Sequence, residues 1–109
     1  MANPSRGEVW LTDLGYVAKV RPCLLLSVPF IGDERSLVTL VPHTTSTRTS
    51  RFEVPLPLPF LRPGAFDTQS LVTVPSVKLL RRLGVLSGSH IASVEAAVAA
   101  WLGLRLSPP

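Results

Sequence analysis

Proline is the feature that most limits how this chain can fold. Eleven prolines occur among its 109 residues. Because proline lacks a backbone N–H and has a fixed φ, it interrupts helices and central strands. We therefore expect short strands with irregular connections. The segment 55–63 contains four prolines, which predicts a stiff, extended or turned conformation and not a helix.

The length predicts a single domain, residues 1–109, with one hydrophobic core. Apolar residues make up 46% of the chain, which is enough to form that core. Cys23 is the single cysteine, so no intramolecular disulfide is expected, and two histidines are too few for a zinc site. The first ten residues lack the apolar region of a signal peptide. No apolar run reaches the roughly 18 residues of a membrane span. We expect a cytoplasmic protein with no membrane partner.

Short runs of apolar and β-branched residues predict the strands. We expect strands at 8–12, 23–28, 37–41, 52–54 and 70–74. The run 23–28 is almost continuously apolar, so it should be buried on both faces. Pro42 is expected to stop the strand that precedes it. Residues 77–80 are expected to form a helical turn. The segment 83–86 is too short to assign to a helix or a strand.

One helix is predicted near the end of the chain. Ser87 or Ser89 can cap its N-terminus, and Gly103 can end it in a left-handed conformation. A spacing of three and four residues puts one set of apolar side chains on a single face. That face consists of Ile91, Val94, Val98 and Trp101. Several short strands and a late helix indicate a mainly β fold, a small β-barrel with a C-terminal helix.

The charge favours an anionic partner and the motifs exclude several enzyme classes. The net charge is +4 at pH 7, which attracts polyanions such as nucleic acid. The sequence has no Gly-rich phosphate loop, no CxxC and no HExxH. Its seven Asp and Glu residues are scattered, which argues against a carboxylate metal site. We therefore expect no metal and no cofactor.

Two cations precede the apolar run at 23–28, namely Lys19 and Arg21. An arginine at the start of a strand can be held by the sheet while its guanidinium reaches solvent. That arrangement suits bidentate capture of a phosphate. The alternative is an ordinary surface arginine beside a turn, and the residues alone leave both interpretations open.

The segment 42–48 follows the third predicted strand and supplies an imidazole, several hydroxyls and a cation. RNA can be cleaved when its 2′-hydroxyl attacks the adjacent phosphate. An enzyme for this reaction must stabilise negative charge on the phosphate oxygens and move two protons. Arginine and hydroxyl donors can meet the first need, and His43 could help with the second because its ordinary pKa is near neutrality. The alternative is a solvated Ser/Thr loop after a strand.

Aromatic side chains could add base stacking if they are exposed. Trp10 and Trp101 are expected in the core. Tyr16 lies in the loop before Lys19 and is better placed to stack on a base.

Taken in order, these segments resemble the MazF/PemK family of toxin–antitoxin systems. Residues 6–14 resemble its opening strand, 20–27 its arginine-proline strand, and 37–45 a strand ending in a characteristic threonine. The later segments 70–74 and 83–95 are similar to the rest of the family pattern, so the likeness spans about 6–104. The resemblance implies an SH3-like barrel of the MazF/PemK/CcdB type, a homodimer and a cognate antitoxin. It also implies metal-independent cleavage of single-stranded RNA that leaves a 2′,3′-cyclic phosphate.

The same resemblance implies roles for particular residues. The family's catalytic arginine and threonine fall on Arg21 and Thr44. The expected RNA-binding residues are Tyr16, Lys19, His43, Thr45, Ser46, Arg48 and Lys78. The chain departs from the family in a shorter loop after the first strand. It also departs at 75–78, where only the cation Lys78 remains of an acidic-Gln-hydrophobic-Arg pattern. The alternatives are a protein-binding toxin similar to CcdB-type gyrase poisons and an inactive RNA-binding barrel.

Overall fold

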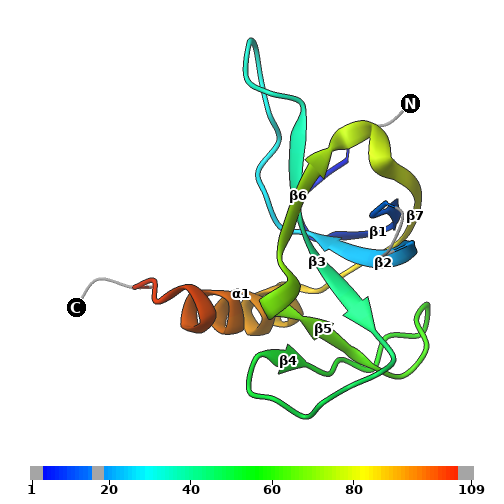
Figure 1. Cartoon of the computed structure of the whole chain (residues 1–109), viewed down its shortest axis with the longest axis vertical. Helices are drawn as coiled ribbons and strands as arrows, with labels where there is room; N and C mark the ends of the chain where they lie inside the picture. Colours follow the sequence, from blue (N-terminus) through cyan, green and yellow to red (C-terminus); the bar gives the residue numbers. More distant parts are fainter. Residues whose placement is uncertain (1–3, 16–18, 106–109) are drawn as a thin grey trace.

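The computed structural model describes residues 4–15 and 19–105. Within them the chain forms seven strands followed by one α-helix (Figure 1). The strands are β1 (Glu8–Asp13), β2 (Val20–Leu25), β3 (Leu37–Thr44), β4 (Glu53–Val54), β5 (Ala65–Asp67), β6 (Val72–Pro75) and β7 (Leu79–Val85). Two 3-10 turns, η1 (Thr68–Ser70) and η2 (Ser76–Lys78), flank β6, and the helix is α1 (Gly88–Leu102). The predicted mainly β fold with a C-terminal helix is confirmed.

Strand β3 organises the sheet because it pairs with three other strands. The sheet order is β4-β5-β3-β2-β1-β7, and β6 also pairs with β3. Residues 37–40 of β3 pair with β6 and residues 43–44 pair with β5, while residues 40–42 pair with β2. All these ladders are antiparallel. The single strand β3 therefore connects the curled sheet in the upper part of Figure 1 to the small β4–β5 ladder below it.

Both faces of β2 are covered by apolar side chains. Cys23 and Leu25 face one hydrophobic cluster, which includes Val38 of β3. Leu24 lies between them and faces a second cluster, to which α1 contributes Val94. Alternate side chains of one strand thus enter two cores, as the pleat requires. Burial on both faces is confirmed for this first half of the predicted run. Burial also raises the pKa of the Cys23 thiol to about 11, so the thiol stays protonated.

The predicted boundaries of β2 and β3 are wrong. Strand β2 begins at Val20 and ends at Leu25, and Val28 is 72% exposed in the connection beyond it. Strand β3 does not stop at Pro42 but continues to Thr44. Pro42 falls between the segment of β3 that pairs with β6 and the segment that pairs with β5. One edge of the strand needs no donor there, so the missing N–H is tolerated.

Strands β5 and β7 were not predicted, and their sequences explain why. Strand β5 has only three residues, preceded by glycine. Strand β7 contains Arg81, Arg82 and Gly84, which obscure the apolar pattern of a strand. It forms nevertheless because β1 pairs with it along its length. The predicted helical turn at 77–80 corresponds to η2, which is shorter and begins one residue earlier.

Helix α1 has the predicted ends. The Ser87 hydroxyl caps its N-terminus by accepting a hydrogen bond from the His90 backbone N–H at 3.2 Å. Gly103 follows its last turn with φ of 70°, the left-handed conformation that glycine adopts without strain. No helix among the described residues is long and apolar enough to cross a membrane.

The predicted apolar face of α1 is confirmed for Val94 and Val98, which are buried. The prediction that Trp101 is a core residue is wrong, because its side chain is 43% exposed. Its ring instead packs edge-on against Phe52, with the ring centroids 5.2 Å apart. The last turn of the helix extends past the sheet (Figure 1), so a residue there is only partly covered.

Candidate nucleic-acid interface

Strands β2 and β3 bring the two predicted catalytic residues together. Arg21 is the second residue of β2, and its backbone pairs with Thr12 of β1. Between β2 and β3, Cys23 lies opposite Pro42. The same antiparallel register, carried two residues further, brings Arg21 opposite Thr44. Both residues line the same cavity. The sheet therefore sets the relative position of a cation and a hydroxyl that are far apart in sequence.

Thr44 is held at both its side chain and its backbone. Its Oγ1 accepts a hydrogen bond from the Ser46 backbone N–H at 3.0 Å. A hydroxyl that accepts in this way keeps its own proton available to donate. The backbone pairs with Ala65 of β5. Gly64, the residue before Ala65, lies so close to the Thr44 backbone that a Cβ at Gly64 would collide with the Thr44 carbonyl oxygen.

His43 supports this strand end from the interior. Its side chain is only 4% exposed, and its ring packs edge-on against Phe66 with centroids 5.1 Å apart. Its Nε2 is buried with no hydrogen-bond partner among the described residues. Burial lowers the pKa of His43, so the imidazole is neutral at pH 7.

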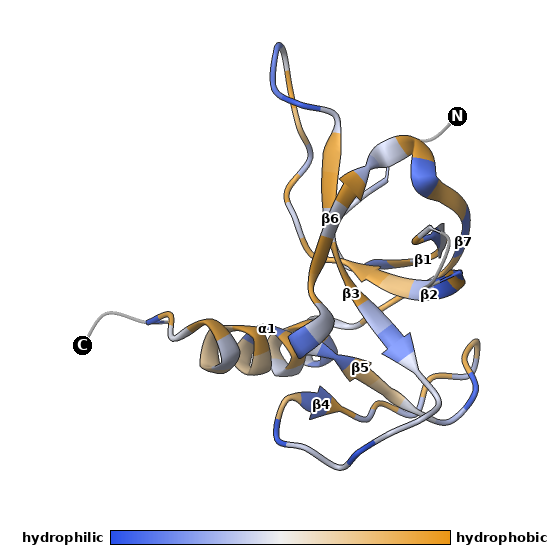
Figure 2. Cartoon of the chain, in the orientation of Figure 1, coloured by the Kyte–Doolittle hydropathy of each residue, from blue (hydrophilic) through white to orange (hydrophobic). Residues whose placement is uncertain are grey.

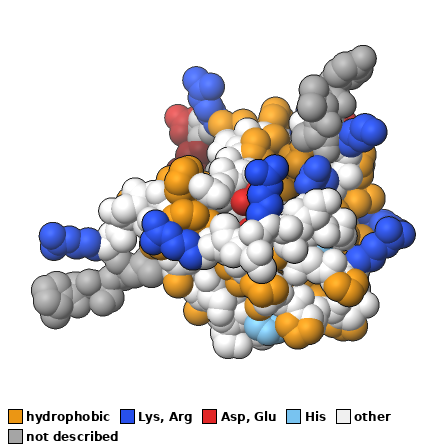
Figure 3. Space-filling model, turned by 60° about the horizontal axis from the view of Figure 1, so that its bottom comes forward, with side chains coloured by type: hydrophobic (Ala, Val, Ile, Leu, Met, Phe, Trp, Pro, Cys, Tyr) orange, Lys and Arg blue, Asp and Glu red, His pale blue; other side chains and the backbone are white. Residues whose placement is uncertain are grey.

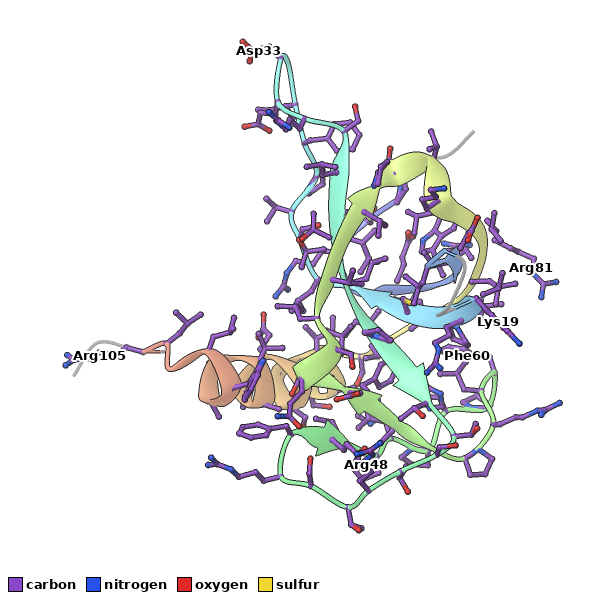
Figure 4. All side chains as sticks on the ribbon, viewed as in Figure 1. Lys19, Asp33, Arg48, Phe60, Arg81 and Arg105 are labelled. Carbon is purple, nitrogen blue, oxygen red and sulfur yellow. The ribbon has the colours of Figure 1, made fainter. Side chains whose placement is uncertain are left out.

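We name the cavity beside Arg21 and Thr44 the cationic cleft. It has a volume of about 850 Å³ and combines cations, hydroxyls and apolar side chains. It is lined by Leu11, Lys19, Val20, Arg21, Pro22, His43, Thr44, Thr45, Ser46, Phe60, Leu61, Arg62, Arg81 and Leu83. Figure 4 shows Lys19, Phe60 and Arg81 on one side of the molecule, far from Asp33 and Arg105. No acidic side chain is among these lining residues, so the cleft suits an anion.

Several predicted RNA-binding residues meet in this cleft. Lys19, Thr45 and Ser46 line it together with Arg21 and Thr44. His43 contributes to the same lining, but its low exposure leaves little of its surface for a ligand.

The remaining predicted residues lie elsewhere. Lys78 ends η2 and is not among the residues that line the cleft. Arg48 lies in the loop after β3 and lines a neighbouring cavity. Tyr16 lies outside the described residues.

The neighbouring cavity, here called the second cavity, has a volume of about 600 Å³. It shares Arg21, Thr44 and Ser46 with the cationic cleft. Its other lining residues include carboxylates, an amide and an indole: Arg48, Ser50, Glu53, Asp67, Gln69, Ser70 and Trp101. Arg21 and Thr44 therefore lie at the junction of two cavities, where an extended ligand could pass from one to the other.

Three cleft residues were missed by the sequence interpretation: Phe60, Arg62 and Arg81. The adjacent cations Arg81 and Arg82 were a visible signal, but β7 had not been predicted, so nothing placed them near Arg21. Phe60 and Arg62 belong to the proline-rich segment, whose path across the cleft depends on tertiary packing.

The polarity of the strands changes where they reach the cleft. Figure 2 shows β2 and β3 mostly hydrophobic along the sheet, and more hydrophilic at the start of β2 and the end of β3. Figure 3 shows Lys and Arg side chains spread over one face of the molecule, with few acidic side chains beside them. Among residues 4–15 and 19–105, no three His, Cys, Asp or Glu side chains are grouped as metal ligands would be.

Comparison with known families gives a match over most of the chain. A family model described as a PemK-like, MazF-like toxin of type II toxin–antitoxin systems matches residues 5–102.

Solved structures agree with that match. An endoribonuclease in complex with its cognate antitoxin, from a mycobacterial species, is 25% identical, with a TM-score of 0.78, and the match covers 98% of this chain and 100% of that one. The Mycobacterium tuberculosis toxin MazF-mt6 is 25% identical, with a TM-score of 0.76 and coverage of 91% and 99%. A MazE–MazF structure from Deinococcus radiodurans is 20% identical, with a TM-score of 0.80 and coverage of 96% and 100%, which supports the fold.

The buried His43 should make the fold sensitive to mild acid. Its pKa is lowered by burial, whereas in the unfolded chain it is about 6.5. As pH falls below about 6.5 the unfolded chain takes up this proton first, so the free energy of unfolding decreases. The free energy of unfolding, measured in urea near pH 7 and near pH 5, should decrease less between these pH values for His43→Gln than for wild type. A His90→Gln variant, the matched control, should keep most of the wild-type loss. An equal loss in all three proteins would contradict this role for His43.

Proposed function

Because the chain belongs to the family of PemK-like, MazF-like toxins of type II toxin–antitoxin systems, we propose that it is a sequence-selective endoribonuclease. Its substrate would be single-stranded RNA, and its reaction would need no metal. The observation that carries the proposal is the convergence of Arg21 and Thr44 at the junction of two cavities. Three further cations surround the same cleft, so the protein's own side chains supply the positive charge that a phosphate requires.

In the proposed reaction the RNA's own 2′-hydroxyl attacks the neighbouring phosphorus. A P–O2′ bond forms as the 2′-hydroxyl loses its proton to solvent, and the P–O5′ bond breaks as O5′ takes a proton from solvent, which leaves a 2′,3′-cyclic phosphate and a 5′-hydroxyl. Negative charge builds up on the non-bridging oxygens during this step. The Arg21 guanidinium can bind two of these oxygens through parallel N–H donors. The Thr44 hydroxyl, whose oxygen already accepts a hydrogen bond from the Ser46 N–H, donates a hydrogen bond to the same phosphate oxygens.

The other predicted residues would bind the strand on either side of this phosphate. We assign Lys19, Thr45 and Ser46 to the cationic cleft, together with Arg62 and Arg81. Arg48 would bind the strand in the second cavity. For His43 we propose a supporting role, since its buried ring backs the end of β3 next to Thr44.

For Tyr16 and Lys78, contact with RNA stays a prediction from the sequence.

We further propose that the protein acts in the cytoplasm as a homodimer controlled by a cognate antitoxin. A disordered acidic segment that folds onto the cationic cleft would neutralise the charge that RNA needs. The mycobacterial relative in complex with its antitoxin supports this partner.

A protein-binding toxin of the same fold, comparable to CcdB-type gyrase poisons, is the alternative. It would have no need for an arginine and a hydroxyl that line the same junction between two cavities. The placement of Arg21 and Thr44 therefore favours the nuclease.

The central test is cleavage of a long single-stranded RNA in EDTA. Wild type should cut at discrete sites, and Arg21→Ala should be slower by about 1000-fold or more, since it removes the charged donors at the transition state. Arg21 is exposed, so its loss should change the free energy of unfolding by no more than about 1 kcal/mol. Arg35→Ala is the matched control, because Arg35 is an exposed arginine of the β2–β3 connection that lines neither cavity. It lies two residues after Asp33, which Figure 4 shows far from Lys19 and Arg81.

Undiminished cleavage by Arg21→Ala would refute the catalytic assignment. Activity that disappears in EDTA and returns with Mg²⁺ would refute the metal-free reaction. If folded wild-type protein makes no cuts, a gyrase assay becomes the next experiment.

Thr44→Ala should be less damaging than loss of Arg21. It removes one hydrogen bond to a charged group, which corresponds to a decrease in kcat of about 10- to 100-fold. Thr44→Ser keeps the hydroxyl and should stay within about threefold of wild type on the same reasoning. Steady-state cleavage of a short RNA that contains one mapped site measures both. The assignment fails if Ala and Ser have the same effect.

The molar mass in solution tests the proposed assembly. Light scattering after size exclusion should give one species of twice the 11.8 kDa chain mass. Adding the acidic tail of the antitoxin as a peptide should block RNA binding, and the block should weaken in high salt because the contact is electrostatic. A monomer that cleaves RNA at full rate would contradict the dimer.

A further inference from the structure

We propose that Phe60 is a base-stacking platform of the cationic cleft, which holds one unpaired nucleobase beside the phosphate that Arg21 binds. This proposal rests on the proposed function, because it needs RNA in the cleft. It assigns a ligand to an aromatic residue outside the Arg21–Thr44 pair.

The backbone around Phe60 is stiff. Phe60 lies in the segment 55–63, where Pro59 immediately precedes it and Pro63 follows. The chain turns at this point, since the Leu61 N–H donates to the Leu58 carbonyl oxygen at 3.2 Å. A ring on such a segment loses little conformational freedom when a ligand binds, so the platform is preorganised.

Strand β7 leaves a space for the ring. A Cβ on Gly84 would lie 2.5–2.6 Å from three atoms of the Phe60 ring. No side chain longer than hydrogen could therefore stand at that position without moving the ring. Phe60 also packs against the core cluster that contains Val9 and Leu24, yet it is only half-buried and lines the cleft. One part of the ring is thus supported by protein, while another part faces the cleft.

The surroundings of Phe60 fit a nucleotide. Leu61 and Leu83 extend the apolar wall, while Lys19 and Arg81 supply cations for the backbone phosphates. Figure 4 shows Phe60 next to Lys19, with Arg81 on the same side. The cleft volume of about 850 Å³ lies in the range that holds a drug-sized molecule. An apolar aromatic surface beside cations is the combination by which proteins bind single-stranded nucleic acid.

The position of the cleft puts the stacked base next to the scissile phosphate. Arg21 and Thr44 line both the cationic cleft and the second cavity, so the scissile phosphate would lie between them. A base in the cationic cleft is then an immediate neighbour of that phosphate. The ring of Phe60 would contact the face of that base, and the arginine and hydroxyl side chains that also line the cleft would be left to contact its edge.

The experiment compares RNAs that lack a single base. The RNA carries the cleavage sequence mapped with wild-type protein, with a 2′-deoxy ribose at the cut site so that it binds without being cleaved. An abasic nucleotide then replaces each flanking position in turn, and fluorescence anisotropy gives the Kd. For wild type, one flanking abasic substitution should weaken binding about 10-fold, the usual loss for one base–aromatic stack.

Variants of Phe60 link that loss to the ring. Phe60→Ala and Phe60→Leu should bind the intact RNA about 10-fold more weakly and should no longer respond to the abasic substitution. Phe60→Trp should bind as wild type does. Gly84→Ala should resemble Phe60→Ala, because its methyl group would displace the ring. Phe30→Ala, which alters a partly exposed phenylalanine in the β2–β3 connection, is the control and should change nothing.

Failure of the stacking platform can be distinguished from failure of the nuclease. If wild type cuts RNA but Phe60→Leu keeps the full abasic penalty, the platform is refuted and the nuclease stands. If folded wild type neither cuts nor binds RNA, the proposed function is refuted, and the platform with it. Phe60→Leu retains most of the apolar volume, so the test stands even if Phe60→Ala does not fold.

Discussion

The structure depends on the pairing of β2 with β3. That ladder sets Cys23 opposite Pro42, and its continuation brings Arg21 opposite Thr44. A shift of the register by one residue would exchange the two faces of β2, moving Leu24 out of its cluster with α1 and Arg21 away from the cleft. Burial of apolar side chains on both faces resists such a shift. The same packing that stabilises the fold therefore sets the geometry of the site.

Much of the site could be predicted because it lies on strands with clear apolar patterns. Arg21 precedes the buried run of β2, and Thr44 ends β3, so both were predicted from local sequence together with a family resemblance, and both line the cleft. Phe60 could not be identified in the same way. Its position depends on a proline-rich connection and on the space left by Gly84 of β7, which is 24 residues away in sequence. Such a contact has no local signature.

Boundary errors have similar causes. Pro42 was expected to end a strand, but it lies where one edge of β3 has no partner, so the usual penalty is absent. Trp101 has the helical spacing of a core residue, yet the last turn of α1 extends past the sheet and leaves the indole 43% exposed. Local spacing identifies a face of a helix, but the extent of the neighbouring layer decides whether that face is covered.

A double-mutant cycle shows whether Arg21 and Thr44 act on the same phosphate. The cleavage rate of one RNA site would be measured for Arg21→Lys, Thr44→Ala and the combined variant, with wild type as reference. If both side chains stabilise one transition state, their losses are coupled, and the combined loss is smaller than the product of the single losses. If the combined loss in rate equals the product of the single losses, the two residues act independently. The assignment of both to one phosphate at the junction of the two cavities would then be contradicted.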